Sequence, residues 1–188
     1  MKQGNQTRNK IIQSSNVLFY KRGFHQTAFS DIVNATGLSK GNITYHFKSK
    51  ENILKAVVEQ RTEQMQILFN SWEEQNSDAQ FLLNCFIDFL LSDKSELSQF
   101  GCPNGTLASE LGKNSTLNKQ ISQGIFNKLR LWLTAQFLKL GYTAEQSNDR
   151  AMELFTRAQG ICVISQVYND ETLFEHEIKR LKKQIVPH

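Results

Sequence analysis

Apolar residues recur at helical spacing along most of the chain, and no alternating strand pattern persists anywhere. Over residues 7–22, Ile11 and Phe19 lie on one predicted helical face. Gly23 follows directly, and a glycine at this position commonly ends a helix. Only two prolines occur in the 188 residues. Together these patterns predict an all-α protein.

A tight glycine turn at Gly37 separates two short predicted helices within residues 27–47. Thr27, or Ser30 one turn later, can cap the first of these helices. Ser39 can cap the second. Two short helices joined by such a turn predict a helix-turn-helix.

A fourth predicted helix begins after Ser49 and runs to about residue 74, where a polar segment predicts a hinge. Beyond the hinge the pattern becomes more apolar. Further helices are predicted over residues 78–93, 104–112, 115–140, 144–168 and 171–185. We therefore expect a helix-turn-helix domain over residues 1–50, with its connecting helix, and a larger helical domain over residues 51–188.

Charge is distributed unevenly along the chain, although the formal net charge is only +4. Residues 1–61 hold ten Lys or Arg against three Asp or Glu, and residues 62–188 hold twelve against fifteen. A basic N-terminal segment followed by an acidic remainder is typical of a polyanion-binding module joined to a second, different part of the protein. Many small basic segments bind no polyanion, so the charge asymmetry alone does not decide whether this segment binds one.

The sequence contains no motif for catalysis, for a cofactor or for a metal site. It lacks a Ser-His-Asp order, an HExxH and the glycine motifs that bind nucleotides. Cys85, Cys102 and Cys162 are widely spaced and predict reduced thiols. No apolar run approaches the roughly 20 residues of a membrane span, and the N-terminus does not resemble a signal peptide. We expect a cytoplasmic protein with no enzymatic activity, no cofactor and no membrane partner.

The third predicted helix would turn a polar face outward, because Ile43 and Phe47 fix its inward side. An Asn can pair bidentately with adenine, and a Thr methyl can touch the thymine methyl. Hydroxyl, ammonium and helix N-terminal N–H groups suit phosphate oxygens. The candidate DNA contacts are Thr27, Ser39, Lys40, Gly41, Asn42, Thr44, Tyr45, Lys48 and Lys50. A merely solvated helix face would carry similar residues.

The run GFHQTAFSDIVNATGLSKGNITYHFKSKENIL resembles the DNA-binding head of the TetR/AcrR family of bacterial regulators. The matching positions are Gly23, Thr27, Ile32, Gly37, Ser39, Gly41, His46, Phe47, Ser49 and Lys50. The chain departs where many members have Tyr two residues before the His: Thr44 stands there and Tyr45 comes one later. Which of the two touches phosphate stays open.

The resemblance implies a transcriptional regulator, a repressor, that binds a palindromic operator in double-stranded DNA as a dimer. It also adds His46 to the DNA-binding residues. From its own pattern, His46 falls on the inward side without a ligand-spaced partner, which favours a packed structural role over metal binding or catalysis.

The second domain is then expected to bind a small hydrophobic or electrophilic effector and to dimerise. Its candidate pocket or sensor residues are Cys102, Phe86, Phe89, Phe100, Trp132 and Phe155. Plain core packing is the ordinary role of any single aromatic residue among them.

Cys102 precedes Pro103 at a predicted helix start, where the helix dipole favours a reactive thiolate. The resemblance suggests a sensor of electrophiles or oxidants at this position. The alternative is a small buried residue at a tight turn, and Cys85 and Cys162 have the pattern of core residues.

Apolar stripes on the last two predicted helices, residues 144–185, predict a homodimer interface on the strength of the resemblance. Burial within one subunit explains the same stripes equally well. Two other functions remain open at this point: a cysteine-based redox or electrophile sensor acting as an activator, and an interaction module that has lost DNA binding.

Overall fold

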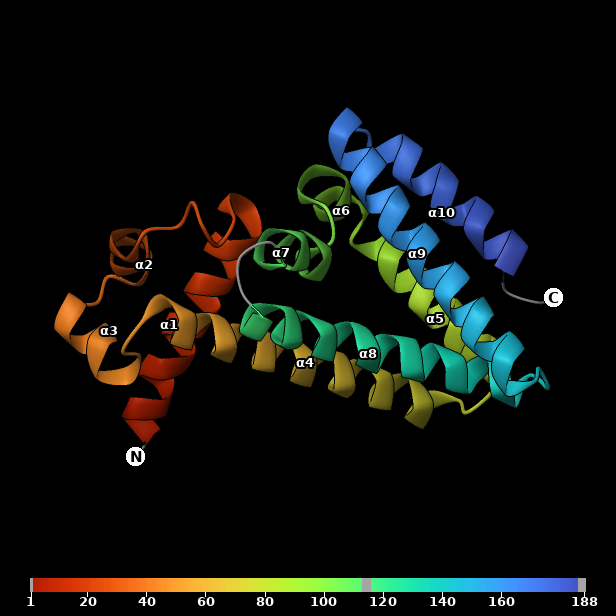
Figure 1. Cartoon of the computed structure of the whole chain (residues 1–188), viewed down its shortest axis with the longest axis horizontal. Helices are drawn as coiled ribbons and strands as arrows, with labels where there is room; N and C mark the ends of the chain where they lie inside the picture. Colours follow the sequence, from red (N-terminus) through yellow and green to blue (C-terminus); the bar gives the residue numbers. More distant parts are fainter. Residues whose placement is uncertain (1, 113–115, 186–188) are drawn as a thin grey trace. The chain divides into compact units, whose positions relative to one another are not determined.

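The computed structural model describes residues 2–112 and 116–185, and every regular element in these ranges is an α-helix (Figure 1). The helices are, in chain order, α1 (Lys2–Arg22), α2 (Phe29–Thr36), α3 (Lys40–His46), α4 (Lys50–Gln75), α5 (Ala79–Ser92), α6 (Lys94–Phe100), α7 (Pro103–Leu111), α8 (Thr116–Lys139), α9 (Ala144–Tyr168) and α10 (Glu171–Ile185). The all-α prediction is confirmed.

Two helices differ from the sequence predictions. α1 begins at Lys2 rather than at residue 7, because the polar residues before Thr7 continue the helix without an apolar stripe to mark them in the sequence. α6 was not predicted, since its seven residues are too few to show a helical period. Residue 115, the predicted start of one helix, lies outside the described residues.

The chain folds into two compact units. The head unit comprises Met1–Gln64 and Thr106–Gln123, and the body unit comprises Met65–Gly105 and Gly124–His188. The predicted domains divide the chain once, near residue 50. The head unit also includes the later segment Thr106–Gln123, which holds most of α7 and the beginning of α8.

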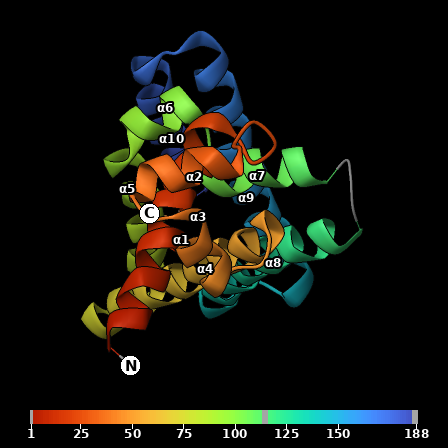
Figure 2. The same cartoon turned by 90° about the vertical axis from the view of Figure 1, so that its left-hand side faces the viewer.

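In the head unit α1 packs against α2, and α2 packs against α3, around an aliphatic core. Figure 2 shows the short α2 and α3 beside the longer α1. Ile11, Ile32 and Ile43, one from each helix, are fully buried. Burying an aliphatic side chain contributes roughly 1.5–3 kcal/mol, so these three residues fix how the short helices pack.

The turn between α2 and α3 has the predicted form. Gly37 ends α2 in the left-handed region, at φ 64°, which a side chain would disfavour. Ser39 caps α3, since its Oγ accepts a hydrogen bond from the Asn42 N–H at 3.2 Å. The sequence prediction of a helix-turn-helix is confirmed in these details.

In the body unit α10 packs along α9, and both helices contact α6. Figure 1 shows α9 and α10 as two blue helices side by side. Phe137 and Phe174 are fully buried in a core that also takes in Leu133 and Leu154. No helix in the described part of the chain is long and apolar enough to span a membrane.

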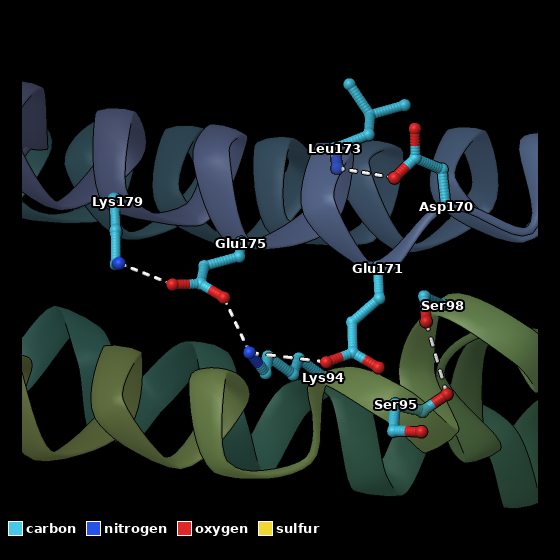
Figure 3. A network of polar contacts seen from close by, with 8 residues as sticks. All are labelled: Lys94, Ser95, Ser98, Asp170, Glu171, Leu173, Glu175 and Lys179. Atoms are coloured by element: carbon cyan, nitrogen blue, oxygen red, sulfur yellow. Dashed lines mark hydrogen bonds and ion pairs between the residues drawn. The ribbon is translucent and has the colours of Figure 1, made fainter.

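Lys94 joins α6 to α10 through a small ionic network (Figure 3). Its Nζ lies 3.2 Å from Glu171 Oε1 and 2.5 Å from Glu175 Oε2, and Lys179 also donates to Glu175. Donation from Lys179 and then from Lys94 lowers the pKa of Glu175 to about 2 from its ordinary 4.5.

This network predicts a dependence of stability on pH. A carboxyl whose pKa is lowered by folding stabilises the fold above its ordinary pKa, and that contribution is lost as the pH falls toward the folded value. Glu175→Gln should therefore reduce the fall in melting temperature between about pH 4.5 and pH 2. The exposed Glu74→Gln is the control. An unchanged pH profile in the Glu175 variant would contradict the prediction.

Candidate nucleic-acid interface and sensor region

The outward face of α3 is polar and open to solvent. Tyr45 is 78% exposed, whereas Ile43 is fully buried and Phe47 is 5% exposed, so the predicted inward side is confirmed. Five other residues in or next to α3 are also exposed: Ser39, Lys40, Gly41, Asn42 and Lys48. A short helix that shows this face to solvent has the form that enters a major groove.

Thr44 and Tyr45 differ in what they offer to a phosphate. The Thr44 hydroxyl is half-buried and donates to the Lys40 carbonyl at 2.8 Å, within its own helix. Tyr45 extends into solvent, with His46 packed edge-on against its ring at a centroid distance of 5.1 Å. Of the two, Tyr45 is the more exposed, and the Thr44 O–H is already donated within α3.

His46 is half-buried at the end of α3. No group of three or more His, Cys, Asp or Glu able to hold a metal occurs among residues 2–112 and 116–185. The His46 ring meets that of the exposed Tyr45, and the place of His46 among the DNA-binding residues stays a prediction.

The predicted contact between the Thr27 hydroxyl and phosphate is wrong. Thr27 is fully buried, and its Oγ1 donates to the Gly23 carbonyl at 2.7 Å. Its backbone N–H donates to the Phe24 carbonyl at 3.3 Å. The prediction that Thr27 or Ser30 caps α2 is also wrong. Ala28 occupies the cap position, and Asp31 Oδ2 accepts from the Ala28 N–H at 2.8 Å.

Lys50 was also predicted to contact phosphate, and the structure gives its ammonium a different role. Lys50 Nζ donates to the carbonyls of Phe24 and Thr27, each at 2.8 Å. It also lies 4.3 Å from the centroid of the Phe24 ring, a cation–π distance. The lysine therefore binds the turn between α1 and α2 instead of standing free beside α3.

Glu110 binds the same turn on its N–H side. Its Oε2 accepts from the Phe24 N–H at 2.8 Å, and its Oε1 accepts from the His25 N–H at 2.6 Å. Gly23, at φ 89°, has no side chain, and a Cβ there would lie 3.1 Å from the carboxylate. We call Glu110 and Lys50 the turn clamp. Sequence reasoning missed Glu110, because its partners lie 85 and 86 residues away and it belongs to no motif.

Arg8 is a further cation that the sequence analysis did not select. It lies on the exposed surface of α1, and its guanidinium carbon stands 5.1 Å from the centroid of the Phe47 ring. Phe47 directly follows α3. The contact adds a positive charge close to the end of that helix.

Cys102 stands at the start of α7, as predicted, and two N–H groups point at its sulfur. The Gly105 N–H and the Gln159 Nε2 each donate to Cys102 Sγ at 3.4 Å. Both contacts direct a polar N–H group at the sulfur. Cys162 is buried, and burial raises its pKa to about 12, which agrees with the predicted core role. Burial also raises the pKa of the half-buried Cys85.

The six predicted effector residues divide among different contacts. Trp132 stacks on Phe69 at a centroid distance of 4.2 Å and donates its Nε1–H to Glu73 at 2.8 Å. Phe89, 38% exposed, contacts Trp72 in the same aromatic cluster. The remaining residues are Phe86 in the core, the half-buried Phe100 on α6, Phe155 against Phe126, and Cys102 against Gln159.

Most residues of the apolar stripes predicted to form a dimer interface are buried within the subunit. Leu154 and Phe174, for example, are fully buried, as the alternative interpretation of the stripes required. A different apolar face of α9 is exposed. It consists of Val163 (55% exposed), Ile164 (50%), Val167 (73%) and Tyr168 (71%), and we call it the α9 face. A groove of about 390 Å³ between α9 and α10 lies beside it.

Known proteins resemble this chain both in the helix-turn-helix segment and in the overall helical fold. Residues 11–57 match a model described as bacterial regulatory proteins, tetR family. An uncharacterized HTH-type transcriptional regulator in the lacX 3′ region of Lactococcus lactis subsp. lactis is 27% identical, over 94% of this chain and 91% of its own.

Solved structures share the fold at lower identity. A TetR-family transcriptional regulator from Agrobacterium tumefaciens superposes with a TM-score of 0.85 at 20% identity, covering 98% of this chain and all of its own. The reduced form of NemR from Escherichia coli has a TM-score of 0.80 at 18% identity, covering 97% of this chain and 98% of its own.

Proposed function

Because the chain belongs to the TetR/AcrR family of transcriptional regulators, we propose that it represses transcription as a homodimer on a palindromic operator and is released by a small effector. The observation that carries the DNA-binding part is the two-sided α3, with Ile43 buried and Tyr45 exposed. A dimer places two such helices on successive half-sites, as two-fold operators require.

Within α3 we assign base reading to Asn42 and phosphate binding to Lys40, Tyr45 and Lys48. Asn42 is exposed in the first turn of the helix, where an amide can reach adenine. The lysines and the phenol suit phosphate oxygens. Ser39 and Gly41 bring the helix N-terminus and its backbone N–H groups close to the DNA.

The test of this function is a titration of the full chain with the duplex that precedes its own gene, repeated at several salt concentrations. A DNA binder shows log K falling linearly with log salt, with a slope set by the number of phosphates contacted. Absence of binding at low salt would exclude the regulator and leave an interaction module.

Asn42→Ala is expected to lower affinity for the operator more than for unrelated duplex, by about 1–3 kcal/mol of discrimination. Lys48→Ala is the matched variant, and it should weaken both duplexes about equally and reduce the salt slope by about one. Equal losses on both duplexes for Asn42→Ala would mean that Asn42 does not read a base.

We further propose that Cys102 senses electrophiles. Its thiolate would add to an electrophilic carbon, forming a C–S bond while the displaced electron pair takes up a proton from water. The support is the pair of donors on Sγ, Gly105 N–H and Gln159 Nε2. An adduct would break these contacts at the start of α7, the helix that also carries Glu110 of the turn clamp.

Cys102→Ser should retain operator binding and lose its release by N-ethylmaleimide, measured by fluorescence anisotropy of labelled operator. Cys85→Ser is the matched control and should still be released. Release of the Cys102 variant at the wild-type dose would contradict the sensor.

A further inference from the structure

A groove in the body unit lies between residues of α8 and α9. These two helices follow one another along the chain (Figure 1). Its volume is about 470 Å³, within the range of small-molecule sites. The lining residues are Phe126, Asn127 and Arg130 from α8, and Asn148, Met152 and Phe155 from α9. Arg130 and Asn148 are the lining residues nearest the connection between the two helices, and Phe126, Asn127 and Phe155 lie farther from it.

Arg130 supplies the polar end with a positioned positive charge. Its Nη1 donates to Asn148 Oδ1 at 2.5 Å, which holds the guanidinium across the two helices. Within the described ranges, no carboxylate forms an ion pair with Arg130. A guanidinium has five N–H donors in a planar fork that matches a carboxylate, and Asn148 uses one of them.

The other end of the groove is an apolar wall. Phe126 and Phe155 pack edge to face at a centroid distance of 5.2 Å, and Met152 lies half-buried beside them. Two aromatic rings and a flexible thioether can accept apolar bodies of different shapes. The groove thus pairs one cation with an apolar surface.

We propose that this groove binds an amphipathic carboxylate, with its headgroup on Arg130 and its apolar body against Phe126, Met152 and Phe155. Because Arg130 is positively charged, the groove should bind the carboxylate more tightly than an amine of the same length. Because the wall is apolar, it should bind a long-chain carboxylate more tightly than acetate. That such an anion is the effector rests on the proposed regulatory function, whereas binding itself does not.

The experiment is calorimetric titration of the full chain with octanoate, n-octanol and n-octylammonium. Octanoate should bind, octanol should bind roughly tenfold or more weakly, and octylammonium should not bind. Arg130→Gln should weaken octanoate binding roughly tenfold to hundredfold while leaving octanol binding unchanged. Arg150→Gln, a neighbouring α9 arginine that lies over Tyr142 instead of in the groove, is the matched control and should bind octanoate normally.

A second variant guards against misfolding of Arg130→Gln. Arg130→Lys keeps the charge without the planar fork and should bind octanoate with intermediate affinity. Equal affinity for the acid and the alcohol, or octanoate binding unaffected by Arg130→Gln, would overturn the proposal. Operator binding without any probe is measured in parallel. Intact operator binding with no octanoate binding overturns the groove alone, whereas loss of operator binding by wild-type protein overturns the proposed function.

Discussion

Replacing Glu110 by alanine is expected to lower the free energy of unfolding of the head unit by about 2–3 kcal/mol and to weaken operator binding. The carboxylate accepts two backbone N–H groups, and hydrogen bonds to a charged group contribute about 1.5–3 kcal/mol each. The His25 N–H is exposed and can return to water, so its loss costs less than that of Phe24. Operator affinity falls because the released turn leads directly into α2.

The chain allows the two units to be observed separately. Both tryptophans, Trp72 and Trp132, belong to the body unit, so their fluorescence reports on that unit, whereas circular dichroism reports on all helices. Urea unfolding of Glu110→Ala should show an early loss of circular dichroism without a change in fluorescence. Glu63→Ala, an exposed head-unit glutamate, is the control. If the circular dichroism and fluorescence transitions of the Glu110 variant coincide with those of the wild type, the clamp contributes nothing measurable to the stability of the head unit.

We propose the α9 face as the dimer interface, so Val167→Asp is expected to convert the proposed dimer to a monomer and to lower operator affinity at least about a hundredfold. Val167 is 73% exposed on the α9 face, so the change has little to disturb within the subunit. In a two-fold interface one substitution acts twice, and each new carboxylate would be buried without a partner.

Light scattering after size-exclusion chromatography measures the mass, and anisotropy of labelled operator measures the affinity. Ile67→Asp is the matched control, because Ile67 is a similarly exposed aliphatic residue (60%) on α4. A dimeric Val167→Asp protein would place the interface elsewhere on the molecule.

The parts of the fold that the sequence predicted well are those determined by neighbouring residues. Gly37 ends α2 and Ser39 caps α3 because a φ above zero and a side-chain acceptor are local requirements. Helix α6 was not predicted, because its seven residues form a helix through packing against α9 and α10 more than through their own sequence pattern. Local signals define capped turns and long amphipathic helices, whereas a short helix without a side-chain cap, such as α6, depends on tertiary contacts.

The site was predicted in part, and its errors share one cause. Thr27 and Lys50 are residue types that bind phosphate, but the Thr27 hydroxyl donates to the Gly23 carbonyl, and the Lys50 ammonium uses two of its three N–H groups on the carbonyls of Phe24 and Thr27. Residue type predicts what a group can bind, not what it has already bound. The periodic apolar stripes mark the side of each helix that its own subunit covers, and a dimer interface within residues 144–185 stays a prediction. The exposed α9 face could be located only from the folded chain.

The turn clamp also bears on the construction of hybrid regulators. Residues 1–50 carry the complete helix-turn-helix, and joining them to another body would be a natural way to redirect an effector response to a new operator. The Phe24 and His25 N–H groups would then lose the carboxylate that Glu110 supplies from outside the transplanted segment. A functional graft should therefore require an acidic residue at the equivalent position of the recipient helix, and a glycine at position 23 to admit it.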